Sequence, residues 1–170
     1  MWVFVPLHAQ RVAVKTNALY WCVGSINAGV EIRMSRHWTA NIEVEGNPFK
    51  IKDYSLRNVA FMPEVRYWLQ GRPMARHFIG LMGVVSHYDA QIKDWQHTGA
   101  AYAAGLTYGY NFVLSRHWSL ELSAGVGLMK MHDCQTPVGK TCSYNANNPY
   151  NSKLIPVPLK AAVTFTYIIK

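Results

Sequence analysis

The sequence lacks a long apolar run: no stretch approaches the roughly 18–20 consecutive apolar residues that a membrane-spanning helix requires. It also lacks an amphipathic helical pattern, and its three cysteines fit no zinc-binding spacing. These absences argue against a helical membrane protein and a zinc module. Residues that favour β-strands are abundant instead, with 10 Tyr, 6 Trp and 6 Phe among Val and Ile throughout. A length of 170 residues suits one all-β domain.

An excess of acidic residues is missing too. Lys and Arg number 17 against 9 Asp and Glu, which gives a formal net charge of +8. Such a balance can indicate nucleic-acid binding. Here the basic residues do not cluster in one segment, and no aromatic-rich RNA-binding signature is present. We therefore expect no nucleic-acid partner.

The tetrapeptide SRHW occurs twice, at Ser35–Trp38 and at Ser115–Trp118, each time between stretches of alternating apolar and polar residues. A short polar turn between two such stretches predicts a β-hairpin. The same pattern along the chain predicts eight strands in a closed, antiparallel, up-and-down β-barrel. The expected strands are Val12–Trp21, Asn27–Met34, Trp38–Glu45, Arg57–Gln70, Arg76–Tyr88, Gly99–Leu114, Trp118–Met131 and Val157–Ile169.

The expected connections alternate in length after the second strand. The tight ones are Ser35–His37, Gly71–Ala75 and Ser115–His117. The long ones are Gly46–Leu56, Asp89–Thr98 and His132–Pro156. Bacterial outer-membrane barrels have short periplasmic turns and longer outer loops, so the alternation predicts a transmembrane barrel with both termini in the periplasm. The connection Cys22–Ile26 departs from this pattern, because it should face outward but is short.

Alternation along the strands separates an apolar face from a polar one. Nothing in the sequence covers the apolar face, which indicates outer-membrane lipid as its partner. The alternative is a soluble β-sandwich or a lipocalin-like ligand binder. If the polar face lines a sealed lumen, its charges must pair with one another, and an eight-stranded interior filled by side chains leaves no pore. The expected lumen charges are Lys15, Glu31, Arg33, Glu43, Glu45, Glu64, Arg66, Glu121 and Lys160.

Aromatic residues at the strand ends are expected to form a girdle at the membrane interface. Its members are Trp38, Tyr67, Tyr110, Trp118 and Tyr167. Basic residues of the tight turns are expected just beyond, at the depth of the phospholipid headgroups, with simple solvation as the alternative; they are Arg36, His37, Arg72, Arg76, His77, Arg116 and His117. Lysines of the long connections are candidate contacts for lipopolysaccharide phosphates, again with solvation as the alternative; they are Lys50, Lys52, Lys93, Lys140 and Lys153.

The first ten residues, MWVFVPLHAQ, resemble the remnant of a secretory signal peptide that would be cut after Ala9, although a positive segment is missing. An ordinary N-terminal strand or arm is the alternative. Residues 11–170 then form the barrel. Cys134 and Cys142 bracket a loop-like segment and are a candidate disulfide in an oxidising compartment, which would leave Cys22 unpaired. Other pairings remain open.

Several motifs together resemble a family of small outer-membrane β-barrels of unknown function from anaerobic Gram-negative bacteria. These motifs are KTNALY, GVEI, EVRYWLQG, HFIGLMG and GLTYGYNFVLSRHWSLELSAGVG, and the resemblance covers nearly all of the chain after residue 11. It implies an eight-stranded barrel in the outer membrane and no catalytic residues, with a hint of adhesion or surface-fibre assembly. The chain departs from the pattern at Pro63, where we expect a bulge, and at its non-aromatic end, where Tyr167 is expected to serve instead.

Two clusters are candidates for chemical sites. A lipid A-modifying enzyme would need a nucleophile and a base that converge, but alternation places Ser86 inside and His87 outside. His132, Asp133 and Cys134 are consecutive and cannot easily converge on one metal ion. The sequence therefore predicts no catalytic residue, no metal site and no cofactor, and favours a structural or surface-interaction role.

Overall fold

The computed structural model describes residues 11–47, 50–51, 54–92, 95–137 and 154–169, with side chains except at 50–57, 88–99 and 131–137. The wall of the fold consists of eight strands: β1 (Val12–Asn17), β2 (Ile26–Arg33), β3 (Trp38–Asn47), β5 (Tyr54–Trp68), β6 (Arg76–Ile92), β7 (Trp95–Val113), β8 (Trp118–Pro137) and β9 (Leu154–Ile169). A two-residue strand, β4 (Lys50–Ile51), pairs with β5, and a short helix, α1 (Ala18–Cys22), follows β1.

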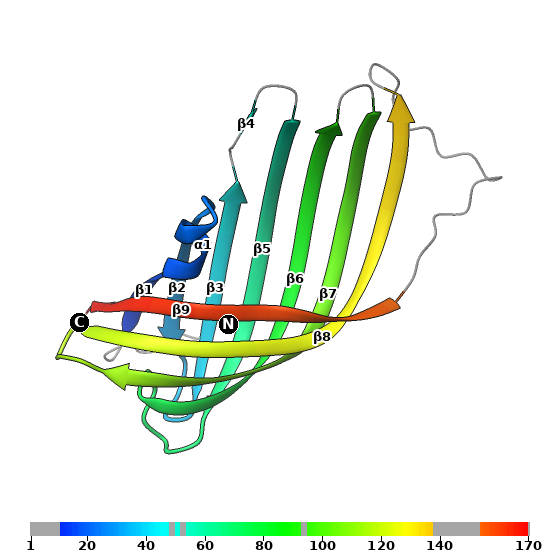
Figure 1. Ribbon diagram of the computed structural model, residues 1–170. Helices are drawn as coiled ribbons and strands as arrows, with labels where there is room; N and C mark the ends of the chain where they lie inside the picture. Colours follow the sequence, from blue (N-terminus) through cyan, green and yellow to red (C-terminus); the bar gives the residue numbers. More distant parts are fainter. Residues whose placement is uncertain (1–10, 48–49, 52–53, 93–94, 138–153, 170) are drawn as a thin grey trace, which may run out of the picture.

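The strands close on themselves. Neighbours follow chain order and are antiparallel throughout, β1 pairs with β9, and β3 pairs with β5 (Figure 1). The prediction of a closed, antiparallel, up-and-down barrel of eight strands is therefore confirmed. Val12 pairs with Ile169 at the same end as the β2–β3, β5–β6 and β7–β8 turns. We call this end the terminal rim.

The apolar face of the sheet is its outer face. In β3, Trp38, Ile42 and Val44 are 46–47% exposed, whereas Thr39 and Asn41 between them are 0–1% exposed. The other wall strands follow the same rule, because side chains alternate between the two faces of a strand. The barrel is thus apolar outside and polar inside, the reverse of a soluble barrel that encloses an apolar core.

Two of the expected long connections are largely strand. β6 and β7 continue through the segment expected as the loop Asp89–Thr98 and pair as far as Ile92 with Trp95. In the segment Gly46–Leu56, β3 reaches Asn47 and β5 begins at Tyr54. The predictions of loops in these two segments were wrong. The hydrogen-bonded ladder between two strands is made by the backbone, so polar residues can continue it where neither face of the sheet has to be apolar. In the third segment, His132–Pro156, β8 runs to Pro137 and β9 begins at Leu154, and residues 138–153 lie outside the described part of the chain.

The first strand is shorter than expected. β1 ends at Asn17 and is followed by α1, where the sequence predicts a strand to Trp21. The side chain of Asn17 accepts a hydrogen bond from the Leu19 amide at 3.1 Å, which caps the first turn of the helix. The same Oδ1 atom accepts from the Val163 amide of β9 at 3.2 Å. The helix was missed because one turn is too short to show a helical period.

Prolines interrupt the wall differently from the expectation. The register between β5 and β6 is the same on both sides of Pro63, so the bulge predicted there is absent and the ladder only lacks the pairs of Met62 and Pro63. A register shift occurs instead between β8 and β9, at Gly125 and Val126. The ladder between β5 and β6 therefore tolerates a missing donor without a change of register.

The pairing that closes the barrel, between β1 and β9, covers only part of β9, and the rest of that edge of β9 is open in the described part of the chain. β1 pairs only with Thr164–Ile169, so the earlier part of β9 has no strand partner on that side among the described residues. Pro156 and Pro158 lie in this part and pair with β8 through Leu128 and Val126. Because proline has no N–H, its missing donor must face away from β8, toward the open edge. Such an edge offers few donors to another strand.

Candidate functional site

A network of seven charged side chains fills the lumen near the terminal rim. The residues come from β1, β2, β3, β5, β8 and β9, and all are 0–5% exposed: Lys15, Glu31, Glu43, Glu64, Arg66, Glu121 and Lys160. They are adjacent because each occupies an inward position on its strand. Alternation in the sequence places these seven on one face, and the structure brings them together.

Arg66 is the centre of this network. Its Nη1 atom lies 3.0 Å from Glu31 and 2.9 Å from Glu121, and its Nη2 atom lies 2.7 Å from Glu64. The guanidinium group also lies 3.6 Å from Glu43. One planar cation thus joins carboxylates from four strands, a task suited to the fixed fork of arginine donors.

Two lysines complete the pairing. Lys15 contacts Glu31 and lies 2.5 Å from Glu121, while Lys160 lies 2.8 Å from Glu43 and 3.2 Å from Glu64. Every acid of the network therefore has at least two cationic contacts. Paired and hydrogen-bonded charges of this kind are tolerated in a dry interior, whereas a single unpaired charge is very costly.

Neutral donors support the remaining carboxylate oxygens. Thr39 and Thr107 each donate through Oγ1 at 2.5 Å, to Glu31 and Glu64 respectively, and Asn41 donates to Glu43 at 2.8 Å. Four acids against three bases leave one extra negative charge, and these donors offset it. Sequence reasoning missed these neutral residues as members of the network. Their signal was available, because each lies on the inward face of its strand.

An aromatic layer separates the network from the terminal rim. Trp68 and Phe78 are fully buried with ring centroids 5.0 Å apart, and the Arg66 guanidinium lies 4.5 Å from the Phe78 centroid. The Trp68 indole N–H donates to Thr39 at 2.9 Å. Gly109 makes room for this layer, because a Cβ atom there would lie 2.5 Å from the Phe78 ring. The Trp68–Phe78 layer therefore covers the side of the network that faces the terminal rim.

Two of the nine expected lumen charges stand apart from the network. Arg33 lies at the terminal rim, where its Nε atom donates to the Ser35 carbonyl at 3.3 Å. Glu45 lies farther along β3 and accepts hydrogen bonds from Tyr20 and Ser25. Burial, with the neighbouring Glu45 and Glu43 carboxylates, raises the pKa of Tyr20, which belongs to α1, to about 12. Alternation predicted on which face of the sheet Arg33 and Glu45 lie, but it could not predict their position along the barrel axis relative to the network.

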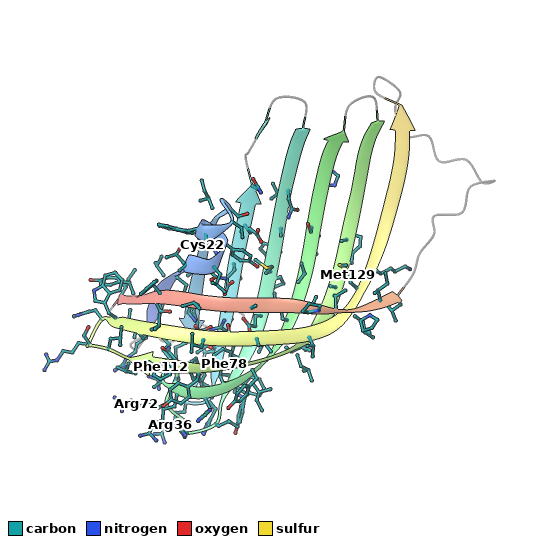
Figure 2. All side chains as sticks on the ribbon, viewed as in Figure 1. Cys22, Arg36, Arg72, Phe78, Phe112 and Met129 are labelled. Atoms are coloured by element: carbon teal, nitrogen blue, oxygen red, sulfur yellow. The ribbon has the colours of Figure 1, made fainter. Side chains whose placement is uncertain are left out.

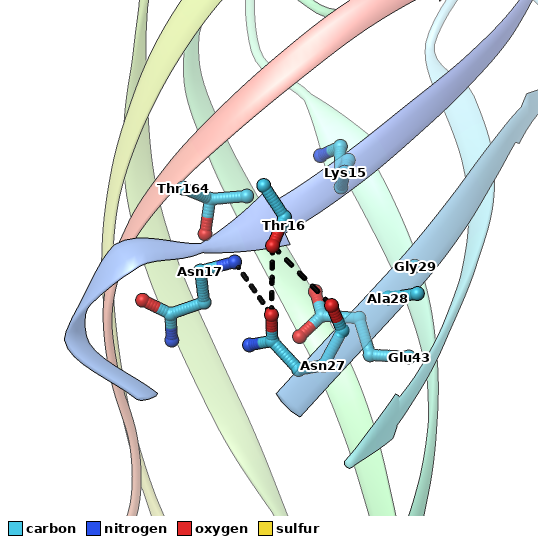
Figure 3. A pocket seen from close by; sticks show the side chains of 8 residues that line it. All are labelled: Lys15, Thr16, Asn17, Asn27, Ala28, Gly29, Glu43 and Thr164. Carbon is cyan, nitrogen blue, oxygen red and sulfur yellow. Dashed lines mark hydrogen bonds between the residues drawn. The ribbon is translucent and has the colours of Figure 1, made fainter. Parts of the chain in front are cut away.

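A small cleft lies beside the network between β1 and β2 (Figure 3). The Asn27 side chain accepts hydrogen bonds there from Thr16 Oγ1 at 2.9 Å and from the Asn17 amide at 3.0 Å. The backbone ladder between the two strands ends at Lys15 and Gly29. The Asn27 side chain therefore continues the connection between the strands beyond that pair.

The two SRHW segments form the same structure at the terminal rim. Trp38 packs edge-on against Tyr67 with centroids 5.1 Å apart, and Trp118 packs in the same way against Tyr167 at 5.0 Å. The preceding histidine stacks on the same tyrosine in each case, at 5.5 Å and 5.9 Å. In each turn the serine hydroxyl accepts hydrogen bonds from the backbone amides of the His and the Trp. The repeat in the sequence is thus a repeat of geometry.

The fifth expected girdle residue, Tyr110, lies at the third turn of the same rim. It packs edge-on against His77 with centroids 4.6 Å apart, and His77 Nδ1 lies 2.7 Å from the Tyr108 hydroxyl. All three turns of the terminal rim therefore combine a histidine with tyrosine. All five expected girdle residues lie near this rim, four of them with 37–51% of their surface exposed: Trp38, Tyr67, Trp118 and Tyr167.

The expected nucleophile and base of a lipid A-modifying enzyme, Ser86 and His87, lie on opposite sides of the wall. Ser86 donates to Asn58 at 2.7 Å inside the barrel, while His87 is exposed outside, so the two do not converge. No group of three or more His, Cys, Asp or Glu in the described part could hold a metal ion. Cys22 is an exposed free thiol. The candidate disulfide Cys134–Cys142, the cluster at His132, the lysines of the long connections and residues 1–10 fall outside the described side chains.

Comparison with known proteins identifies a family. Residues 1–169 match a family described as "Protein of unknown function (DUF3575)", and the chain belongs to that family. No curated protein and no solved structure matches the chain. None of the helices in the described part of the chain is long and apolar enough to cross a membrane.

Proposed function

Because membership of this family assigns no activity, we propose that the protein is an outer-membrane β-barrel with a structural or surface-interaction role. Its lumen, filled by paired side chains, conducts no solute. In this proposal both termini and the terminal rim face the periplasm, and the opposite end faces outward.

The observation that carries the proposal is the apolar outer surface. Every wall strand carries at least one large apolar side chain with 43–63% of its surface exposed; one example from each is Val14, Val30, Ile42, Val65, Leu81, Leu106, Leu122 and Phe165. Soluble proteins rarely expose a continuous apolar surface larger than a few hundred Å². A band that encircles a closed barrel matches the lipid-facing surface of outer-membrane proteins.

The sealed lumen supports a role other than transport. Arg66, Glu31 and Glu121 are 0% exposed, and the Trp68–Phe78 layer lies next to the network on the side of the terminal rim. An eight-stranded barrel has an interior just wide enough for side chains to fill. The network therefore blocks the lumen across its width. A blocked lumen fits a barrel that anchors or supports the outer end of the protein and does not transport solutes.

The proposal is tested by refolding the chain into vesicles that contain phospholipids brominated at defined acyl positions. Insertion predicts migration on gels that changes on heating, and tryptophan emission that shallow bromine atoms quench more than deep ones. The Trp38→Phe/Trp118→Phe variant should lose most of this shallow quenching, because these two residues mark the interface. Planar-bilayer recordings should show no channel conductance. Stable solubility without detergent or lipid would contradict the proposal.

Orientation needs a separate experiment in cells. An epitope tag placed within residues 138–153 should be accessible to antibody on intact Gram-negative cells, and a tag after Lys170 should be accessible only after the outer membrane is permeabilised. Chemical cross-linking on the same cells would identify a surface partner. Accessibility of the C-terminal tag on intact cells would reverse the proposed orientation.

A further inference from the structure

We infer that a groove at the terminal rim binds the phosphate headgroup of a membrane glycerophospholipid. The groove lies between the β5–β6 turn and the end of β7 and has a volume of about 560 Å³. Arg72 of the turn and Arg76, the first residue of β6, line one side. Phe112 near the end of β7 and Leu114 just beyond it line the other. Figure 2 labels Arg72 and Phe112 at this end of the barrel. The proposed function enters only in placing the groove at the periplasmic leaflet.

The groove carries positive charge without a local acid. Arg72 and Arg76 are both exposed, and the rim segments 33–38, 68–77 and 111–118 contain no Asp or Glu. Two guanidinium groups on one groove repel each other, and an anion between them removes that repulsion. Arginine donors fit the oxygens of a phosphate in pairs, which makes phosphate a better match than a monovalent halide ion.

The turn that presents these arginines is held in an unusual conformation. Met74 and Arg76 have φ angles of 62° and 66°, a region that residues other than glycine seldom occupy. The Met74 side chain is 2% exposed, and the Asn111 side chain donates to the Met74 carbonyl at 2.9 Å. Strained backbone that its surroundings fix in this way is typical of binding sites. The turn therefore holds Arg76 at the groove before any ligand arrives.

The other side of the groove carries exposed apolar side chains. Phe112 is 44% exposed and Leu114 is 62% exposed, and Val113 between them is 54% exposed. A soluble phosphate would leave these side chains in water. A glycerophospholipid satisfies both sides, since its phosphate reaches the arginines while its glycerol and first acyl carbons cover the apolar residues. The ligand class is therefore a lipid and not a free anion.

The test uses the full chain in a phosphate-free maltoside detergent, with binding measured by isothermal titration. The probes are dihexanoylphosphatidylglycerol, dihexanoylglycerol, which lacks the phosphate, and glycerol 3-phosphate, which lacks the acyl chains. The Arg72→Gln/Arg76→Gln variant should bind the phospholipid about tenfold more weakly or worse, because charge-assisted hydrogen bonds are lost. The Arg33→Gln/Arg36→Gln variant removes the same charge from the same rim outside the groove and should change affinity less than about twofold.

A second variant checks the apolar side. Leu114→Ser should weaken phospholipid binding and leave the weak binding of glycerol 3-phosphate unchanged. Equal losses in the two arginine variants would overturn the inference, as would equal affinity for dihexanoylglycerol. Equal affinity for glycerol 3-phosphate would assign the site to soluble phosphate and overturn the lipid assignment. Heat-modifiable migration confirms that each variant is folded.

The two proposals fail separately. A chain that binds the phospholipid in detergent but does not insert into vesicles would contradict the proposed function and support the groove. A chain that inserts but shows no phospholipid binding would overturn the groove alone.

Discussion

Arg66 and Glu121, from β5 and β8, meet across the lumen with their Nη1 and Oε2 atoms 2.9 Å apart. Both side chains are 0% exposed. Replacing Arg66 with Leu would leave four carboxylates with only two lysines in the same dry space. Removing one partner of a buried ion pair costs about 3–5 kcal/mol. We expect at least that loss in the free energy of unfolding, measured by urea titration of the chain in lipid vesicles.

Arg33→Leu is the matched control for Arg66→Leu. It removes the same charge from a side chain at the rim, and its effect should stay within about 0.5 kcal/mol. Adding Glu64→Gln and Glu121→Gln to Arg66→Leu should recover part of the lost stability, because each lysine then keeps one carboxylate partner, Glu31 for Lys15 and Glu43 for Lys160. Equal effects of the two arginine substitutions would show that the network does not stabilise the barrel.

The close contact of Gly105 with Gly127, between β7 and β8, gives a second prediction. A Cβ atom at Gly105 would lie 2.2 Å from the Val126 carbonyl oxygen and 2.6 Å from the Gly127 Cα. Both atoms belong to the backbone and cannot move aside as a side chain would. Gly105→Ala should therefore lower the unfolding free energy by about 1–3 kcal/mol.

Gly46→Ala is the control for this substitution, because no atom lies within 4 Å of a Cβ built there. Its effect on the same urea titration should stay within about 0.5 kcal/mol. A tolerated Gly105→Ala would mean that β7 and β8 separate without cost at this pair.

Much of the barrel follows from the sequence, because alternation is a local property. Alternation alone places the polar positions Glu31, Glu43 and Glu121 inside and the apolar positions outside, and their burial in the fold agrees. The two SRHW segments likewise marked two tight turns correctly. These features need only the two-residue period of a strand and a turn between strands.

The remaining features depend on contacts between distant segments. Glu45 lies farther from the terminal rim than the network does, and its position along the barrel axis is set by the register of β3 against β2 and β5. The extension of β6 and β7 through the expected loop at Asp89–Thr98 depends on their mutual pairing. The Arg72–Arg76 groove depends on how the β5–β6 turn folds back on Asn111. A single sequence contains none of these distances.

The repeated geometry at Trp38 and Trp118 predicts equal energetic roles. Each indole meets a tyrosine edge-on with centroids 5.0–5.1 Å apart, and each is about half exposed. Such aromatic pairs contribute about 0.5–1.5 kcal/mol beyond the area that they bury. Trp38→Leu and Trp118→Leu should each lower the unfolding free energy by about 1 kcal/mol in vesicles. A clear loss from one substitution with none from the other would show that the two turns are not energetically equivalent.

The prolines of β9 give the last prediction, which concerns association between molecules. Pro156 and Pro158 leave the open edge of β9 without two donors. Pro156→Thr/Pro158→Thr would add two N–H groups to an edge that has no strand partner among the described residues, and such groups promote pairing with another chain. We expect dimers and larger species to increase in detergent, measured by light scattering after size-exclusion chromatography.

Pro63→Thr is the control, because Pro63 lies between β3 and β6 within the closed wall. Its new N–H can complete the ladder with β6 and should stabilise the barrel by about 1 kcal/mol without association. If the β9 variant stays monomeric at every concentration at which the Pro63 variant does, the prolines do not protect this edge.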